Sequence, residues 1–222
     1  MIKRFYAILL LLLVTITSFG QPFINDINRF KEIDKENPPH QNAILFIGSS
    51  SFTMWHDVQE QFPEHTIINR AFGGSTLEDQ IRYFDDVVLP HNPKQIVIYC
   101  GENDFASNDT ISANLVIQRF VKLYNLITIS FPDVKISYVS MKPSPSRWHL
   151  AKKFTIGNKG IQKFLESKPN TSYISVWDEM LLDSGLPNLS FFLDDLLHMN
   201  AKGYKIWQRA ILPHLIKQHK KQ

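Results

Sequence analysis

The apolar residues of this chain fall into two kinds of segment. Short apolar runs bounded by turn residues are typical of strands buried on both faces of a parallel sheet. Longer segments, with apolar residues three and four positions apart, are typical of helices that cover such a sheet. The short runs predict five strands, at residues 43–47, 66–69, 95–100, 134–140 and 171–176.

The segments between these strands predict the helices. We expect them at residues 23–35, 52–62, 76–88, 110–130, 148–167 and 200–217, with a loop over residues 178–195. Strands that alternate with helices favour a parallel sheet with right-handed crossovers. We therefore predict an α/β fold with a parallel sheet of about five strands, as a single domain over residues 21–222.

Polar clusters recur where the predicted strands end. Ser50, Gly74, Asn103 and Arg147 each lie in the segment that follows a different strand. Because ligands of open α/β sheets bind beyond the carboxyl ends of the strands, these residues are expected to share one site.

The first cluster, Gly48-Ser49-Ser50-Ser51, supplies the candidate nucleophile. A hydroxyl on a sharp strand-to-helix turn is exposed and close to a helix N-terminus, so we predict that Ser50 is the nucleophile. The cluster also fits a plain turn with an N-cap, or a phosphate cradle of backbone N–H groups. The two nucleotide-binding glycine motifs are absent, and Phe52 stands where a G-x-S-x-G elbow would have its last glycine.

A serine nucleophile needs a histidine base and gains from a carboxylate beside that base. Among eight histidines, His198 lies just before the last predicted helix, and Asp195 precedes it by three residues. On a turn, this spacing can bring the carboxylate to Nδ1 and leave Nε2 facing the serine. The alternative is an ordinary loop aspartate, with Asn200 as a helix N-cap.

The oxyanion of an acyl transfer needs hydrogen-bond donors. The backbone N–H groups of Ser50 and Gly74 and the side-chain amide of Asn103 are the candidates. Each also has an ordinary structural explanation, as a turn glycine or a capping residue.

In these blocks the sequence resembles the SGNH (GDSL-type) hydrolases, near their platelet-activating-factor acetylhydrolase-like branch. The resemblance covers about residues 43–210. It rests on four blocks in order: Gly48-Ser49-Ser50, Asn69-Arg70-Ala71-Phe72-Gly73-Gly74, Gly101-Glu102-Asn103-Asp104 and Asp195-Leu196-Leu197-His198. One departure is that Ser49 replaces the aspartate of the family's first block.

The resemblance implies a flavodoxin-like three-layer α/β/α fold and ester hydrolysis without metal or cofactor. It implies Ser50, His198 and Asp195 as the catalytic triad. It implies Ser50, Gly74 and Asn103 as the oxyanion hole.

The substrate is the least determined part. Phe52, Trp55, Phe105 and Trp148 follow strand ends and either line the cleft or belong to the core. Arg147 either binds a polar substrate group or lies in a solvated loop. We expect a serine esterase for short acyl, chiefly acetyl, esters such as an acetylated sugar. The alternatives are a lysophospholipase-type acyl hydrolase, a catalytically silent glycan-binding module, and a phosphate-binding domain of flavodoxin type.

Composition and the amino-terminal residues bear on location. Lys3 and Arg4, an apolar segment from Ala7 to Ile16 and small residues before Gln21 predict a signal peptide over residues 1–20, and hence an exported, periplasmic or secreted protein. An uncleaved anchor is the alternative. The net charge of +3 gives no reason to expect nucleic-acid binding, and a single cysteine, Cys100, excludes an internal disulfide.

Overall fold

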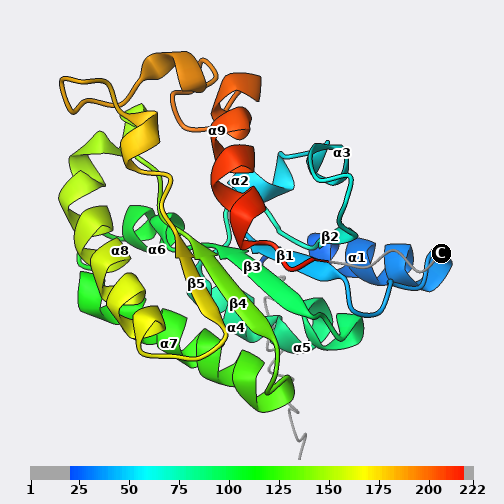
Figure 1. Cartoon of the computed structure of the whole chain (residues 1–222). Coiled ribbons are helices and arrows are strands. Elements are labelled where there is room, and N and C mark those ends of the chain that lie inside the picture. Colours follow the sequence, from blue (N-terminus) through cyan, green and yellow to red (C-terminus); the bar gives the residue numbers. More distant parts are fainter. Residues whose placement is uncertain (1–20, 218–222) are drawn as a thin grey trace, which may run out of the picture.

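The computed structural model describes residues 21–217 and has a parallel sheet between two layers of helices (Figure 1). The strand order is β2-β1-β3-β4-β5, and every neighbouring pair is parallel. The strands are β1 (Ile44–Gly48), β2 (Ile67–Asn69), β3 (Gln95–Tyr99), β4 (Lys135–Val139) and β5 (Thr171–Ile174). The prediction of a five-stranded α/β/α fold is therefore confirmed. The predicted signal peptide lies outside the described residues.

The central strands β1 and β3 are buried along their whole length, which explains their unbroken apolar sequences. Successive residues point to opposite faces of the sheet. Leu45 and Ile47 join one core cluster, whereas Ile44 and Phe46 join the other.

The two core clusters correspond to the two helical layers. Buried residues of one layer come from α1 (Ile24–Glu36), α4 (Leu77–Arg82), α5 (Phe84–Val87), α7 (Ala113–Ser130) and α8 (Ala151–Glu166). Those of the other come from α2 (Ser50–Thr53), α3 (Val58–Gln61) and α9 (Ala201–Ile211). The short helix α6 (Glu102–Ser107) follows β3.

Two predicted helices are interrupted. The expected helix 52–62 is divided into α2 and α3, because side chains distant in sequence donate hydrogen bonds to the carbonyls of α2. Tyr204 Oη donates to the carbonyl of Ser51 at 2.9 Å, and Asn69 Nδ2 donates to that of Phe52 at 2.7 Å. The expected helix 76–88 bends at Tyr83, a buried residue that hydrogen-bonds the carbonyl of Pro22.

Two other boundaries differ from the prediction. The last long helix ends at Ile211, and Pro213 lies in the 3-10 turn that follows it, because proline has no N–H to continue the helix. The helix expected from 148 begins at Ala151, after a 3-10 turn over Pro145–Leu150.

The segment between β5 and α9 passes over the carboxyl edge of the sheet, on the same side as α2 (orange in Figure 1). Two isolated bridges brace this segment, Leu181 with Pro187 and Phe192 with Met199. Over residues 21–217, no helix has the length and apolar character needed to cross a membrane.

Candidate active site

The turn after β1 brings Ser50 to the N-terminus of a helix. Gly48 has φ +132°, and a Cβ on it would lie 1.9 Å from the carbonyl oxygen of Tyr99. Only glycine allows this close approach of β1 to β3. Ser49 is extended and Ser50 is the first residue of α2, so the Ser50 N–H has no acceptor within the helix.

The carbonyl of Gly48 anchors the neighbouring loop. It accepts hydrogen bonds from Phe72 N at 3.0 Å, Ser75 Oγ at 3.0 Å and Gln80 Nε2 at 3.2 Å. These bonds hold the loop before α4 against the nucleophile turn. Sequence reasoning missed Gln80, because a glutamine within a helical pattern gives no sign of a contact 32 residues away.

Asn69, the first residue of the second block, ties the same loop to α2. Its Nδ2 donates to Phe52 as described, and its Oδ1 accepts from Ala71 N at 3.1 Å. Gly74 has φ +83°, and a Cβ on its neighbour Gly73 would lie 3.8 Å from Ser50 Cβ. In the described part of the chain, no hydrogen bond occupies the N–H of Ser50 or of Gly74. Both remain available as donors.

Asn103 lies in the first turn of α6, and its side chain is held at both ends. Its Nδ2 donates to the carbonyl of Ser75 at 3.0 Å, and its Oδ1 accepts from Arg147 Nη2 at 2.8 Å. The second N–H of this amide is left for another acceptor. Asn103 is thus linked to the loop that contains Gly74, as the predicted oxyanion hole requires.

Asp195 and His198 contact one another within one closed turn. Asp195 Oδ2 lies 2.6 Å from His198 Nδ1, and its Oδ1 accepts from the backbone N–H groups of Leu197 and His198, each at 2.9 Å. Leu196 takes a left-handed conformation, φ +55°, within the turn. A carboxylate at Nδ1 fixes the ring so that Nε2 is the free basic nitrogen.

These hydrogen bonds also set the protonation of the carboxyl group. Partial burial favours the neutral acid, but the hydrogen bonds from the His198 backbone and ring and from Leu197 outweigh it and lower the pKa of Asp195 to about 2. The carboxyl group is therefore ionised across the physiological range.

The turn is joined to the rest of the carboxyl edge. Ser146 N donates to the carbonyl of Leu196 at 3.0 Å, and Tyr204 of α9 bonds α2 at Ser51. Within residues 21–217, no hydrogen bond joins Ser50 Oγ to His198. That bond is often longer in free enzymes and tightens with substrate.

The aromatic residues considered for substrate binding are mostly buried in the core. Phe52, Trp55 and Phe105 are at most 1% exposed and belong to the core, so the structure favours the core alternative for all three. Their side chains are buried, although they follow strand ends as cleft residues would. Trp148 is half-buried and stacks on Trp177, with centroids 6.0 Å apart.

Arg147 is half-buried and contacts protein rather than solvent. It reaches Asn103, as described, and also Glu102 Oε2 at 3.3 Å. These contacts make a freely solvated loop a poor description of this position, and the expected substrate contact stays a prediction.

Cys100 is buried and poorly placed to act as a nucleophile. Burial, and then the charge of Asp104, raise the pKa of the Cys100 thiol well above its usual value, which disfavours the nucleophilic thiolate. Among the residues that the structure describes, no group of three or more His, Cys, Asp or Glu side chains is placed to hold a metal ion.

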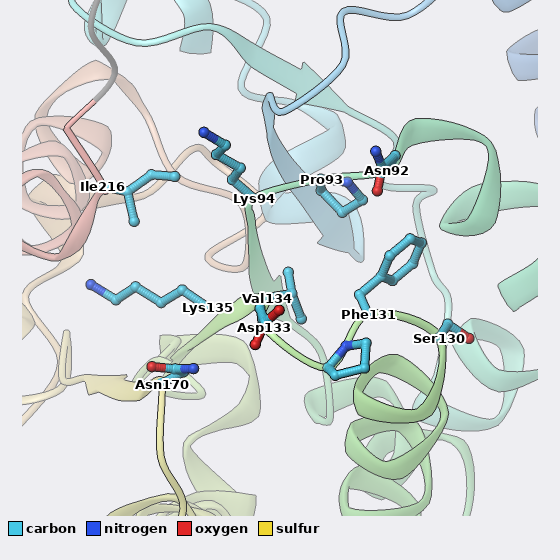
Figure 2. Close-up of a pocket in the computed structure, with 11 residues that line it drawn as sticks. Asn92, Pro93, Lys94, Ser130, Phe131, Asp133, Val134, Lys135, Asn170 and Ile216 are labelled. Carbon is cyan, nitrogen blue, oxygen red and sulfur yellow. The ribbon is translucent and has the colours of Figure 1, made fainter.

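A hollow of about 610 Å³ lies at the opposite, amino-terminal edge of the sheet (Figure 2). It is lined by residues such as Lys94, Phe131, Lys135, Asn170 and Ile216, which precede or begin strands or follow α9. None of the candidate catalytic residues lines it. The candidate catalytic residues lie at the carboxyl edge instead.

Several solved structures share the fold of this chain. A provisionally assigned platelet activating factor from Streptococcus pneumonia is 19% identical, with a TM-score of 0.76 over 86% of this chain and 92% of that chain. A GDSL-like lipase from Bacteroides thetaiotaomicron is 19% identical, with a TM-score of 0.71 over 85% and 97%. A variant of an acetyl-xylooligosaccharide esterase from Geobacillus Stearmophilus is 14% identical, with a TM-score of 0.59 over 82% and 98%.

A comparison with curated proteins found no match. The family model of GDSL-like lipases and acylhydrolases matches residues 47–206, which include every residue of the candidate triad and oxyanion hole. The chain therefore belongs to the GDSL-like lipase/acylhydrolase family.

Proposed function

We propose that this protein is an exported serine esterase that removes short acyl groups, chiefly acetyl, from ester substrates. The proposal rests on the Asp195–His198 contact of 2.6 Å at the same sheet edge as Ser50. A serine at a helix N-terminus, a histidine oriented by a carboxylate and unoccupied N–H donors are the three parts that acyl transfer needs.

In this mechanism Ser50 Oγ attacks the carbonyl carbon of the ester while His198 Nε2 takes the hydroxyl proton. The tetrahedral oxyanion is held by the N–H groups of Ser50 and Gly74 and by the amide of Asn103. Collapse breaks the bond to the alcohol, which leaves with the proton from His198. Water then attacks the acyl-enzyme with the same proton transfers, which releases the acid and restores Ser50.

Two observations support a small acyl group on a sugar. The stacked pair Trp148 and Trp177 is partly exposed, and Trp148 directly follows Arg147, the partner of Asn103. Flat indole faces suit a sugar ring. The fold is also that of an acetyl-xylooligosaccharide esterase.

One observation favours a second candidate, a lysophospholipase-type acyl hydrolase. Exposed leucines gather in the segment that leads to His198, and they are Leu182, Leu186, Leu189, Leu193 and Leu196. Apolar surface beside a site would suit a long acyl chain.

The test is hydrolysis of p-nitrophenyl acetate, butyrate and octanoate by residues 21–222, beside Ser50→Ala. We expect Ser50-dependent turnover that falls with chain length. Turnover that rises with chain length would favour the lysophospholipase. Wild-type rates in Ser50→Ala would refute the triad, and no turnover by folded protein would favour the glycan-binding module.

Export is tested separately. We expect a mature protein that begins at Gln21 outside the cytoplasm, which amino-terminal sequencing of the exported fraction would detect. Recovery of the intact chain in the membrane fraction would favour the uncleaved anchor.

A further inference from the structure

A buried charged cluster lies behind the proposed oxyanion hole. The side chains of Glu102 and Lys142 are 4% and 2% exposed, and the hydrolytic steps use neither. Burying charges is costly unless they are paired and hydrogen-bonded, so this cluster needs an explanation.

The pair is fully partnered. Lys142 Nζ lies 3.2 and 3.4 Å from the two oxygens of Glu102, and the backbone N–H of Lys142 donates to Oε1 at 2.9 Å. Tyr99 Oη donates to Glu102 and accepts from Lys142 Nζ at 3.1 Å. Burial opposes ionisation of Glu102, but Lys142 and Arg147 outweigh it and lower its pKa. Glu102 is therefore a fixed anion.

This anion holds Arg147. One nitrogen of the guanidinium lies 3.3 Å from Glu102 Oε2, and the other donates to Asn103 Oδ1 at 2.8 Å. The planar fork of arginine can reach two neighbouring acceptors at once, which lysine with its single nitrogen does less well.

The bond from Arg147 determines which way the Asn103 amide faces. Because Oδ1 faces the guanidinium, Nδ2 faces the carbonyl of Ser75 and keeps one N–H for the oxyanion. A rotated amide would present its oxygen to the oxyanion and to the Ser75 carbonyl, and both contacts would be repulsive. The adjacent cation also polarises the amide and strengthens its N–H as a donor.

We propose that Arg147 is a positioning residue: held by the buried Glu102–Lys142 pair, it keeps the Asn103 amide turned toward the oxyanion. The inference rests on the proposed function, because it assigns Asn103 a part in the same hole. It assigns Arg147 a role in addition to the predicted contact with substrate, which stays a prediction.

The decisive experiment compares Arg147→Met, Asn103→Ala and the double variant with p-nitrophenyl acetate. We expect Arg147→Met to lower kcat about 10- to 100-fold with little change in KM, which is less than the roughly 10²–10³-fold loss typical when an oxyanion donor is removed outright. Because both residues act through one amide, the double variant should be no slower than Asn103→Ala. The proposal would be overturned if the loss of kcat in the double variant were the product of the two single losses. A raised KM with unchanged kcat in Arg147→Met would also overturn it.

Two further variants keep the comparison interpretable. Arg209→Met makes the same substitution in an exposed ion pair with Glu179 and should leave kcat unchanged. Arg147→Lys keeps the charge and should recover part of kcat. If Arg147→Met does not fold, Arg147→Lys with and without Asn103→Ala gives the same additivity test.

A readout independent of turnover separates this inference from the proposed function. In ¹⁵N NMR, the side-chain amide signal that disappears in Asn103→Ala should shift in Arg147→Met and stay in place in Arg209→Met. An unmoved signal would overturn the positioning role. Absence of Ser50-dependent hydrolysis in the wild type, with the signal shifted, would instead refute the esterase and leave Arg147 as the residue that orients this amide.

Discussion

At the scale of single residues, Asp195 and His198, the proposed acid and base, form a local unit. Asp195 is nearly half exposed, with 47% of its side-chain surface accessible, yet its two oxygens receive three hydrogen bonds from one turn. The carboxylate is therefore fixed by geometry more than by burial.

This geometry predicts how Asp195 affects stability with pH. Since its folded pKa of about 2 lies below the ordinary value of 3.8, Asp195 stabilises the fold fully above about pH 4, and this contribution is lost as the pH falls toward 2. Urea unfolding of wild type and Asp195→Asn should differ at pH 7 and converge near pH 2. A difference that is the same at both values would contradict the lowered pKa.

The neighbouring Asp194 offers a control, because the resemblance places Asp195 and not Asp194 in the triad. Asp194→Asn should leave kcat unchanged. A loss of kcat equal to that of Asp195→Asn would show that the assignment between the two aspartates is wrong.

Single residues also show how much of the site could be predicted from the sequence. The D-x-x-H spacing allowed a contact between Asp195 and His198, and the family resemblance favoured it. The contact is present, with all its atoms in one turn. Phe52 and Phe105 could not be assigned, because core and cleft aromatic residues after a strand look alike in sequence. Arg147 was singled out, but its partners are 44 and 45 residues away and leave no local pattern.

At the scale of elements, helix α9 begins beside the catalytic turn. Asn200 caps it, with Oδ1 accepting from Lys202 N at 2.9 Å and Gly203 N at 3.3 Å. Its Nδ2 donates to the carbonyls of Ser190 and Phe192 at 2.9 and 3.0 Å. One side chain thus joins the helix to the segment that approaches His198.

We therefore expect Asn200→Ala to lower the free energy of unfolding by about 1–2 kcal/mol and to lower kcat. Asn200→Ser keeps a capping oxygen and should recover much of the stability. It cannot reach both carbonyls, so its kcat should stay low. Urea unfolding and p-nitrophenyl acetate turnover measure the two effects. Equal losses of stability in the two variants would argue against the capping role.

The positions of strands were predicted better than those of helices. The central strands β1 and β3 are short, mostly apolar runs that are buried along their whole length, so their sequences were sufficient to predict them. The break between α2 and α3 depends on Tyr204 and Asn69, which reach the carbonyls of α2 from 153 and 17 residues away. Helix α6 has a single large apolar residue, Phe105, so periodicity gave no reason to expect it.

At the scale of the whole molecule, α1 is fixed to the sheet layer by a partly buried polar contact. Arg70 pairs with Asp34 of α1, and His91 Nε2 lies 3.6 Å from the same carboxylate. Burial of His91 lowers its pKa to about 4, with Asp34 opposing and Arg70 adding to the effect. The imidazole is therefore neutral in the folded protein near pH 7.

A buried neutral histidine makes stability fall in mild acid. The unfolded chain takes up a proton near pH 6.5 and the folded chain only near pH 4, so stability should decrease as the pH falls through this window, by at most about 3 kcal/mol. His91→Leu should flatten this dependence of stability on pH. Urea midpoints at pH 7, 5.5 and 4.5 measure it. If His91→Leu kept the wild-type dependence of stability on pH, His91 would be excluded as the cause of that dependence.

The closed turn around His198 has a consequence for the evolution of new specificities. The chain upstream forms a separate small loop between Leu181 and Pro187, and at its tip Gly185 has open space around it. Residues can be inserted there without moving the acid and base, which are joined to each other and to α9 further along the chain. Insertions after Asp183 should therefore be a tolerated way to build a lid or an added substrate pocket, so that related proteins can diverge in what they bind while the reacting groups stay in place.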